Sequence, residues 1–422
     1  MSGAVRPARA SLAALAAVAL LAGCDRIANA RPERALERRV ARLVPAIERN
    51  TGLKFKRQPR VEARSPAEVR AVVEQGFRES RAARDLAGYE AAYKALGLIP
   101  PALDLRKILL DLLEEQVAGF YDPKAKALYV VSGTPAKTLD LTVAHELVHA
   151  LQDQYVSLDS VRQADVDNDV ATAAQAAIEG HATYVSLLDV ARTADVASLP
   201  GGWATIASGI RDQSALAEGL GAAPAAVREA LIFPYAGGLP FVAAAYAAHT
   251  GVALVADAPR STEQVLHPAA FGAPRDRPTR VVLPPPGGGT LVYENTLGEF
   301  ETRLVLAEHL RDTAAAARGA AGWDGDRYTV LEFPGGARGI VWATVWDSDG
   351  DADEFRALLA RAMTRRYRAA DGALDGGAAS ASGRALAVRV ARAGGRPLVL
   401  FSDLPDGAAA PLDPAKLVLR EE

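Results

Sequence analysis

Hydrophobic residues recur at helical spacing along most of the first 250 positions of the chain. Because an amphipathic helix places an apolar residue on its buried face every three or four positions, this pattern predicts a largely helical body. Ser65, Pro66 and Glu68 begin one predicted helix as a capping box with proline at the first helical position. The predicted helices cover residues 34–49, 65–77, 86–96, 103–116, 137–155 and 166–192, and most of 203–249.

Strand patterns are short in this part of the chain. Residues 117–131 contain two β-rich runs around an Asp-Pro-Lys turn, which predicts a β-hairpin directly before the helix at 137–155. Residues 52–63 form a short extended stretch.

The pattern changes after residue 267. Residues 277–300 are rich in proline and glycine and then open a helix at Thr296, with Glu299 in the capping position. Two strands, a helix and two further strands are predicted at 326–333, 339–347, 351–367, 385–393 and 397–404. The expected fold is therefore α+β, mainly α, with a small C-terminal α+β layer packed on a helical body.

Composition and charge exclude some classes of protein. The 422 residues suffice for two or three packed units, and half of them are hydrophobic. A formal charge of −3 provides no basic surface for nucleic acid, so no nucleic-acid partner is expected. Nothing in the sequence indicates an oligomeric state.

The single cysteine, Cys24, excludes an internal disulfide. It follows Arg6, Arg9 and an apolar run at 11–23 that is too short to cross a bilayer as a helix, which is typical of a secretory signal. The ending "LAGC" resembles the lipobox of bacterial lipoproteins, which implies cleavage before Cys24 and lipidation of its thiol. The chain is then exported and lipid-anchored to a bacterial membrane, on the periplasmic or extracellular face. A simple signal peptide or an N-terminal membrane helix is the alternative.

The helix at 137–155 carries the motif H-E-x-x-H as His145, Glu146 and His149. At 100° per residue the two histidines lie 40° apart, so both imidazoles leave the same face of the helix, opposite its leucines. Two imidazoles in this arrangement can bind one Zn²⁺ ion. The alternative is a pair of surface histidines on an amphipathic helix.

A catalytic zinc usually has a third protein ligand. Metzincins require glycine and histidine shortly after the motif, and Gln152 and Tyr155 occupy those positions here. The stretch "AAIEGHATYV" resembles the gluzincin pattern E-G-x-A, which implies Glu179 as the third ligand and implies that small residues let its helix approach the first. His181 is the competing ligand, but two residues along a helix turn through 200°, so it and Glu179 cannot both face one metal.

Two features depart from the thermolysin-like pattern. Twenty-nine residues lie between His149 and Glu179, so we expect a longer loop around 158–169. Thr183 stands where that pattern has an aspartate that orients a ligand histidine, and Asp153 is a candidate replacement.

Beyond the metal motif, the chain resembles a group of secreted bacterial metallopeptidase-like proteins. The resemblance rests on the segments at 115–131, 145–154, 178–185, 259–268 and 322–328. It implies a zincin-like catalytic domain and a peptide or protein substrate. The last segment, "GWDGDRY", has a simpler interpretation as a turn that leads into a strand. The expected units are a signal peptide at 1–23, a tether and helix at 24–60, the catalytic domain at 61–270 and the C-terminal region at 271–422.

In this interpretation Glu146 is the general base, because it lies beside a ligand but cannot easily bind the same metal. The strand at 126–131 is expected to be the substrate-binding edge strand. Either His267 or Tyr235 is expected to donate to the oxyanion, and glycines after Tyr235 would let a substrate backbone approach. The alternatives are a catalytically silent, peptidase-like envelope lipoprotein that acts as a binding or assembly module, and a zinc hydrolase that acts on a non-peptide bond.

Overall fold

The computed structural model describes residues 32–422, apart from 80, 117, 165, 191–195, 197–198, 218, 249–253, 255, 286, 409–411 and 422. Cys24 and the predicted signal peptide lie outside the described residues, so lipidation stays a prediction.

Up to residue 282 the described elements are mostly helices with a few short strands, and after it they are mostly strands. The helices before that point are α1 (Pro32–Thr51), α2 (Pro66–Glu79), α3 (Arg81–Leu96), α4 (Leu105–Gln116), α5 (Ala136–Gln152), α6 (Leu158–Gln163), α7 (Asn168–Val190), α8 (Trp203–Leu216), α9 (Ala225–Ala236), α10 (Gly238–Ala247), α11 (Thr262–Leu266) and α12 (Pro268–Phe271). The strands there are β1 (Arg60–Arg64), β2 (Gly119–Asp122), β3 (Ala127–Val131) and β4 (Thr279–Val282). The remaining elements are β5 (Thr290–Asn295), α13 (Gly298–Leu310), α14 (Thr313–Ala320), β6 (Trp323–Glu332), β7 (Arg338–Trp346), α15 (Asp349–Tyr367), β8 (Ala378–Ala381), β9 (Arg384–Ala393), β10 (Arg396–Pro405), a 3₁₀ turn (Pro414–Lys416) and β11 (Val418–Glu421).

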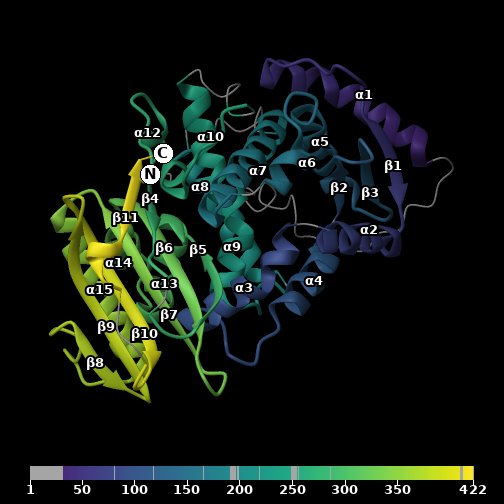
Figure 1. The fold of residues 1–422 in the computed structure, drawn as a ribbon. Coiled ribbons are helices and arrows are strands. Elements are labelled where there is room, and N and C mark those ends of the chain that lie inside the picture. The colour runs from purple at the N-terminus through teal and green to yellow at the C-terminus, as the bar shows by residue number, and fades with distance from the viewer. Residues whose placement is uncertain are drawn as a thin grey trace, which may run out of the picture.

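A three-stranded sheet with the order β1-β3-β2 lies at one end of the molecule (Figure 1). Strand β3 pairs in parallel with β1 and antiparallel with β2. The helices α1 and α5 pack on this sheet and close a hydrophobic cluster that contains Leu43, Leu128 and Leu147. This packing fixes α5, the helix that carries the H-E-x-x-H motif.

The helical body is built around α7, which contacts α5, α9 and α10. Residues 225–247 are long and apolar enough to cross a membrane by length and composition alone, and 56% of that window is buried. In the structure this stretch is α9 and α10, which pack on α7, so its apolar character is explained by the core of the helical body.

A six-stranded antiparallel sheet with the order β5-β6-β7-β10-β9-β8 forms the other end (Figure 1). Residues on β7 alternate between its two faces, as a half-turn per residue requires. Ile340 and Trp342 face the core shared with α13 and α15, whereas Val341 and Ala343 face a second cluster with β4 and the 3₁₀ turn.

The predicted α+β, mainly α class is confirmed. The predicted capping role of Glu299 is wrong, because α13 begins at Gly298 and its first N–H groups donate to another residue. Asp326 on β6 accepts from the backbone N–H of Leu297 and of Gly298, at 3.0 and 2.9 Å. The loop expected around 158–169 contains the short helix α6. The predicted domain boundary near residue 270 stays a prediction, although α3 packs across it on β5, β6 and β7.

Candidate metal centre

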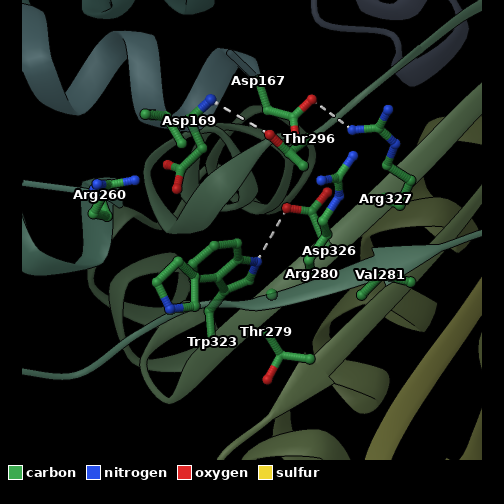
Figure 2. Close-up of a pocket in the computed structure, with 13 residues that line it drawn as sticks. Asp167, Asp169, Arg260, Thr279, Arg280, Val281, Thr296, Trp323, Asp326 and Arg327 are labelled. Carbon is green, nitrogen blue, oxygen red and sulfur yellow. Dashed lines mark hydrogen bonds and ion pairs between the residues drawn. The ribbon is translucent and has the colours of Figure 1, made fainter. Parts of the chain in front are cut away.

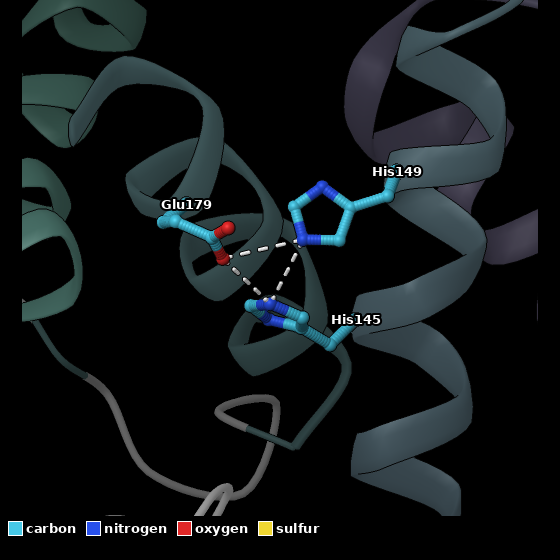
Figure 3. A group of neighbouring side chains, drawn as sticks. All are labelled: His145, His149 and Glu179. Atoms are coloured by element: carbon cyan, nitrogen blue, oxygen red, sulfur yellow. Dashed lines mark hydrogen bonds and ion pairs between the residues drawn. The ribbon is translucent and has the colours of Figure 1, made fainter. Parts of the chain in front are cut away.

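Three side chains from two helices converge at one point (Figure 3). His145 and His149 project from α5 and Glu179 projects from the middle of α7. The Nε2 atoms of the two histidines are 3.2 Å apart, and each lies 3.2 Å from Oε2 of Glu179. The three candidate ligand atoms therefore form an equilateral triangle.

This triangle fits a small metal ion. A tetrahedral ion with bonds of about 2.0–2.1 Å separates its ligand atoms by roughly 3.3 Å. All three side chains are buried, with exposed fractions of 6%, 4% and 6%. His145, His149 and Glu179 are thus a group that could hold a metal ion.

Gln152, one turn beyond the motif, fixes the orientation of His149. Nδ1 of His149 donates to Oε1 of Gln152 at 2.8 Å, which directs Nε2 toward the other two side chains. The amide nitrogen of Gln152 donates to the carbonyl of Ile178 on α7, at 3.0 Å. Gln152 therefore links the orientation of one ligand to the helix that carries the third.

Asp153 was a candidate for this orienting role, but its side chain binds other residues. Its carboxylate accepts from Tyr121 at 2.8 Å and from Lys126 at 2.6 Å, on the side of α5 that faces the hairpin. At 100° per residue, Gln152 and Asp153 lie on opposite sides of His149, and only Gln152 lies on the side that is turned to α7. A glutamine after the motif was visible in the sequence, but its partner on α7 was not.

The charges of the triad depend on one another. Burial opposes the charged form of His149, but attraction by Glu179 outweighs it and raises the pKa of His149 to about 9. Burial likewise opposes ionisation of Glu179, yet His149 and His145 hold the pKa of that carboxyl well below its usual range. Without a bound metal, the triad thus holds a proton on His149 beside an ionised Glu179. A cation bound among the three would replace this proton.

Glu146 lies beside the triad and is also buried, with an exposed fraction of 8%. Burial raises the pKa of its carboxyl, and the two histidines partly offset that increase. A hydrogen bond from the backbone N–H of Tyr121 on β2 also lowers the pKa of Glu146. Glu146 is therefore held between the triad and the edge of the three-stranded sheet.

The strand next to the triad is β2, and not the strand expected from the sequence. Residues 126–131 were expected to form the substrate-binding edge, but β3 is the central strand because β1 pairs on its far side. The outer strand on the side of α5 is β2, which runs so close to this helix that a Cβ added to Gly119 would lie 3.0 Å from Thr142. The backbone of Val131 donates to Ala118, so Gly119 and Tyr121 occupy non-hydrogen-bonded pairs and turn their N–H and C=O groups outward.

The structure places Tyr235 beside the triad. Its ring on α9 stacks on His145, with ring centroids 6.1 Å apart and planes inclined by 28°. Nδ1 of His145 is buried and has no hydrogen-bond partner among the described residues. Packing against the ring of Tyr235 therefore contributes more to the orientation of His145 than to that of His149, which has a hydrogen bond to Gln152.

His267 lies in different surroundings. It ends α11, and its Nε2 contacts the buried carboxylate of Glu299 at 3.0 Å and Arg303 at 3.2 Å, both on α13. These contacts join two helices and do not involve the triad.

His181 points away from the triad, as the 200° argument requires. Its Nε2 lies 2.7 Å from the hydroxyl of Tyr246, and its Nδ1 accepts from Gln152 at 3.0 Å. Burial lowers its pKa to about 4, so the ring is neutral and serves as a hydrogen-bonding group in the core.

The small residues near Glu179 allow α7 to pack closely on two other helices, α5 and α10. Ala182 packs in the cluster shared with α5, which agrees with the expected close approach of α7 to α5. Gly180 instead faces α10, where an added Cβ would lie 2.3 Å from the backbone of Gly238. Gly238 therefore contacts protein backbone, and the expectation that the glycines after Tyr235 admit a substrate is wrong for this glycine.

The segment "GWDGDRY" is a structural junction near the start of α7 (Figure 2). Besides accepting from α13, Asp326 accepts from the indole N–H of Trp342 at 2.9 Å and from that of Trp323 at 3.2 Å. Its carboxylate thus joins two strands and one helix, which favours the simpler interpretation of this segment.

The fold and the triad define an α+β protein with a group between α5 and α7 that could bind a metal ion. A domain of unknown function (DUF8575) matches residues 289–409, which hold β5 to β10 and none of the triad. No curated protein matches the sequence. One solved structure, a "putative hydrolase with a novel fold" from Chloroflexus aurantiacus, is 16% identical with a TM-score of 0.35, over 58% of this chain and 91% of that one. A similarity of this extent identifies no activity for this chain.

Proposed function

We propose that this chain is a zinc-dependent peptidase, held on the outer side of a bacterial membrane through lipidated Cys24. The observation that carries the proposal is the triad of His145, His149 and Glu179 with a buried fourth residue, Glu146, directly beside it. Two imidazoles and one carboxylate are the ligand set of zinc peptidases that leave a coordination position open. A zinc ion bound there would supply Lewis acidity toward a carbonyl oxygen and would acidify a water molecule.

Glu146 performs the proton transfers in this proposal. Its carboxylate accepts a proton from the attacking water and then passes it to the leaving amine, so it ends the cycle unchanged. A protein that only binds metal has no need of a buried carboxylate in this position, because burial makes such a group costly.

The outward-facing backbone of β2 binds the substrate as an added strand. An extended peptide can pair with the backbone of Gly119 and with the carbonyl of Tyr121, which are turned away from β3. Such pairing would align a peptide alongside α5, whose Glu146 interacts with the same strand at Tyr121. This arrangement favours peptides over other substrates of zinc hydrolases.

Tyr235 is the oxyanion donor in this proposal, because it stacks on His145 whereas His267 is bound to Glu299 and Arg303. A phenol O–H that donates to the developing negative charge is typically worth on the order of 10²–10³ in rate.

The test uses purified protein, its zinc content and cleavage of a peptide library. The wild type should hold about one zinc per chain. Glu179→Ala should lose the zinc, whereas His181→Ala should keep it. Glu146→Gln should keep the zinc and lose on the order of 10²–10⁴ in turnover. Glu74→Gln, which neutralises a surface carboxylate paired with Arg78, is the control and should be fully active.

Two results would contradict the proposal. Undiminished turnover by Glu146→Gln would exclude its role as general base. A wild type that holds zinc and cleaves no peptide would favour the binding-module alternative. In the same assay, Tyr235→Phe should lose rate while it keeps zinc, and His267→Ala should change little; the reverse result would move the donor role to His267.

The anchor is tested separately from the chemistry. Membrane-extracted protein should have the mass of a chain that begins at a diacylated Cys24, and Cys24→Ser should leave the membrane fraction or remain unprocessed. An unchanged mass and unchanged partitioning of Cys24→Ser would exclude lipidation.

A further inference from the structure

A second group of acidic side chains lies at the boundary between the helical body and the six-stranded sheet. Glu263 belongs to α11, Asp276 to the loop before β4, and Asp347 follows the last residue of β7. One carboxylate oxygen from each lies within 4.8 Å of the others. None of these residues belongs to the triad.

Glu263 distinguishes this group from an ordinary acidic surface patch. Its exposed fraction is 5%, and burial and repulsion by neighbouring carboxylates raise its pKa, with no hydrogen bond among the causes. The backbone around it is well paired, because Ser261 caps α11 and the side chain of Gln264 bonds the backbone of Asp276. The chain therefore places this buried carboxylate within 4.8 Å of two others.

Most charges around Glu263 are negative, although Arg396 attracts the nearby Asp347. The carboxylates of Asp276, Glu299, Asp347 and Asp324 all repel a negative charge on Glu263. The nearby cation Arg396 is bound to Asp324, and Arg303 and His267 are bound to Glu299. A buried carboxylate among like charges is costly unless a cation compensates it.

We propose that Glu263, Asp276 and Asp347 bind a divalent cation, and that this cation is Ca²⁺. Carboxylate oxygens without imidazole or thiolate select a hard cation, in contrast to the triad. Oxygens on opposite sides of a Ca²⁺ ion with bonds of about 2.4 Å are separated by up to about 4.8 Å, so three oxygens that lie within 4.8 Å of one another are close enough to bind one ion. Asp276 and Asp347 are exposed, so water can complete the six to eight positions that Ca²⁺ requires.

The site would join parts of the chain that are distant in sequence. Glu263 comes from the segment 259–268 and is anchored to α7 by its neighbour Thr262, which donates to Asp169 at 3.0 Å through its backbone. Asp347 is the residue that leaves β7 toward α15. A Ca²⁺ ion held by both would therefore stabilise the packing of the helical body on the sheet, independently of catalysis.

The test measures thermal unfolding of protein that is stripped of metal with EGTA, freed of the chelator and reloaded with one equivalent of zinc. Adding CaCl₂ to about a hundredfold excess over the Kd should raise the Tm by on the order of 3–6 °C. Calorimetric titration should show one site. Glu263→Gln should remove both effects, and Asp347→Asn should weaken binding at least tenfold. Asp353→Asn, which neutralises an exposed carboxylate on α15 outside the acidic group, is the matched control and should titrate like the wild type.

Two further readouts separate this site from the triad. His149→Ala should lose zinc and keep the Ca²⁺ titration, and Glu263→Gln should keep about one zinc per chain. The proposal is overturned if the wild type shows neither a heat of binding nor a Tm shift up to about 10 mM CaCl₂, ten times the weakest affinity of extracellular calcium modules. It is equally overturned if Glu263→Gln and Asp347→Asn both bind Ca²⁺ as the wild type does. If Glu263→Gln fails to fold, the exposed Asp347→Asn decides the outcome.

Discussion

At the scale of single residues, the ligand geometry depends on a glutamine that bridges two helices. Gln152 accepts from His149 and donates to the backbone of Ile178, so it holds the imidazole and the third ligand's helix in one arrangement. Partners of this kind typically contribute 10–100-fold to metal affinity.

We therefore expect Gln152→Leu to weaken zinc binding about 10–100-fold, measured by competition with a chromophoric chelator. Gln152→Glu keeps an acceptor for Nδ1 of His149 and should restore most of the affinity. Gln154→Ala, which removes contacts to Lys56 and Arg57, is the control and should bind zinc normally. Equal affinities for Gln152→Leu and the wild type would show that His149 is oriented by other groups.

The sequence was sufficient to predict the site residues whose relative positions follow from spacing along one helix. His145 and His149 share a face at any i, i+4 spacing, and the same rule excluded joint use of Glu179 and His181. It was insufficient where the partner is set by tertiary packing. The acceptor for Nδ1 of His149 depends on which side of α5 meets α7, and local periodicity does not determine that.

At the scale of elements, the helices and strands were predictable and their neighbours were not. The capping box at Ser65 is present, with Glu68 accepting from the Ser65 backbone at 2.8 Å. The position of β3 in its sheet was missed because α2, α3, α4 and β2 separate it in the chain from its second partner, β1. Such long-range pairing leaves no signal in a local pattern of alternation.

The crossing of α7 and α10 gives a prediction at this scale. Gly180→Ala would place a methyl group 2.3 Å from the backbone of Gly238, so the helices must separate. We expect a loss of about 1–3 kcal/mol in the free energy of unfolding, and weaker zinc binding because Glu179 is the preceding residue. Denaturant titration and zinc competition measure the two effects.

Gly209→Ala is the matched control on α8. Its added methyl group meets no atom within 4 Å, so the free energy of unfolding should rise by about 0.5–1 kcal/mol through better helix propensity. Similar stability of the two alanine variants would show that α7 and α10 can separate at little cost.

At the scale of the whole molecule, buried carboxyls between the helices and the sheet make stability depend on pH. Burial raises the pKa of Glu301 to about 8 and that of Asp169 to about 7. In the unfolded chain these groups titrate near 4, so between about pH 4 and 8 the native state binds more protons than the unfolded state. Stability is then greatest at the acidic end and falls as pH rises through the native pKa values.

We expect Glu301→Gln to flatten this dependence, because the amide cannot ionise and still accepts the hydrogen bond from Tyr93. Urea unfolding at about pH 5.5 and 8.5 should show that the variant gains stability relative to the wild type at the higher pH. Glu308→Gln, whose carboxylate pairs with Arg311 near the surface, should keep the wild-type dependence. Parallel pH profiles for Glu301→Gln and the wild type would contradict the assignment.

The helix α7 contributes residues to two hydrophobic clusters. Ala173, Ala176 and Leu187 belong to the larger cluster, whereas Ala182 and Val185 belong to the cluster closed by α1 and α5. Opening either cluster therefore disturbs the other through the helix that carries Glu179. Amide protons in the middle of α7 should then exchange with solvent only through global unfolding, and the third ligand should persist until the whole molecule opens.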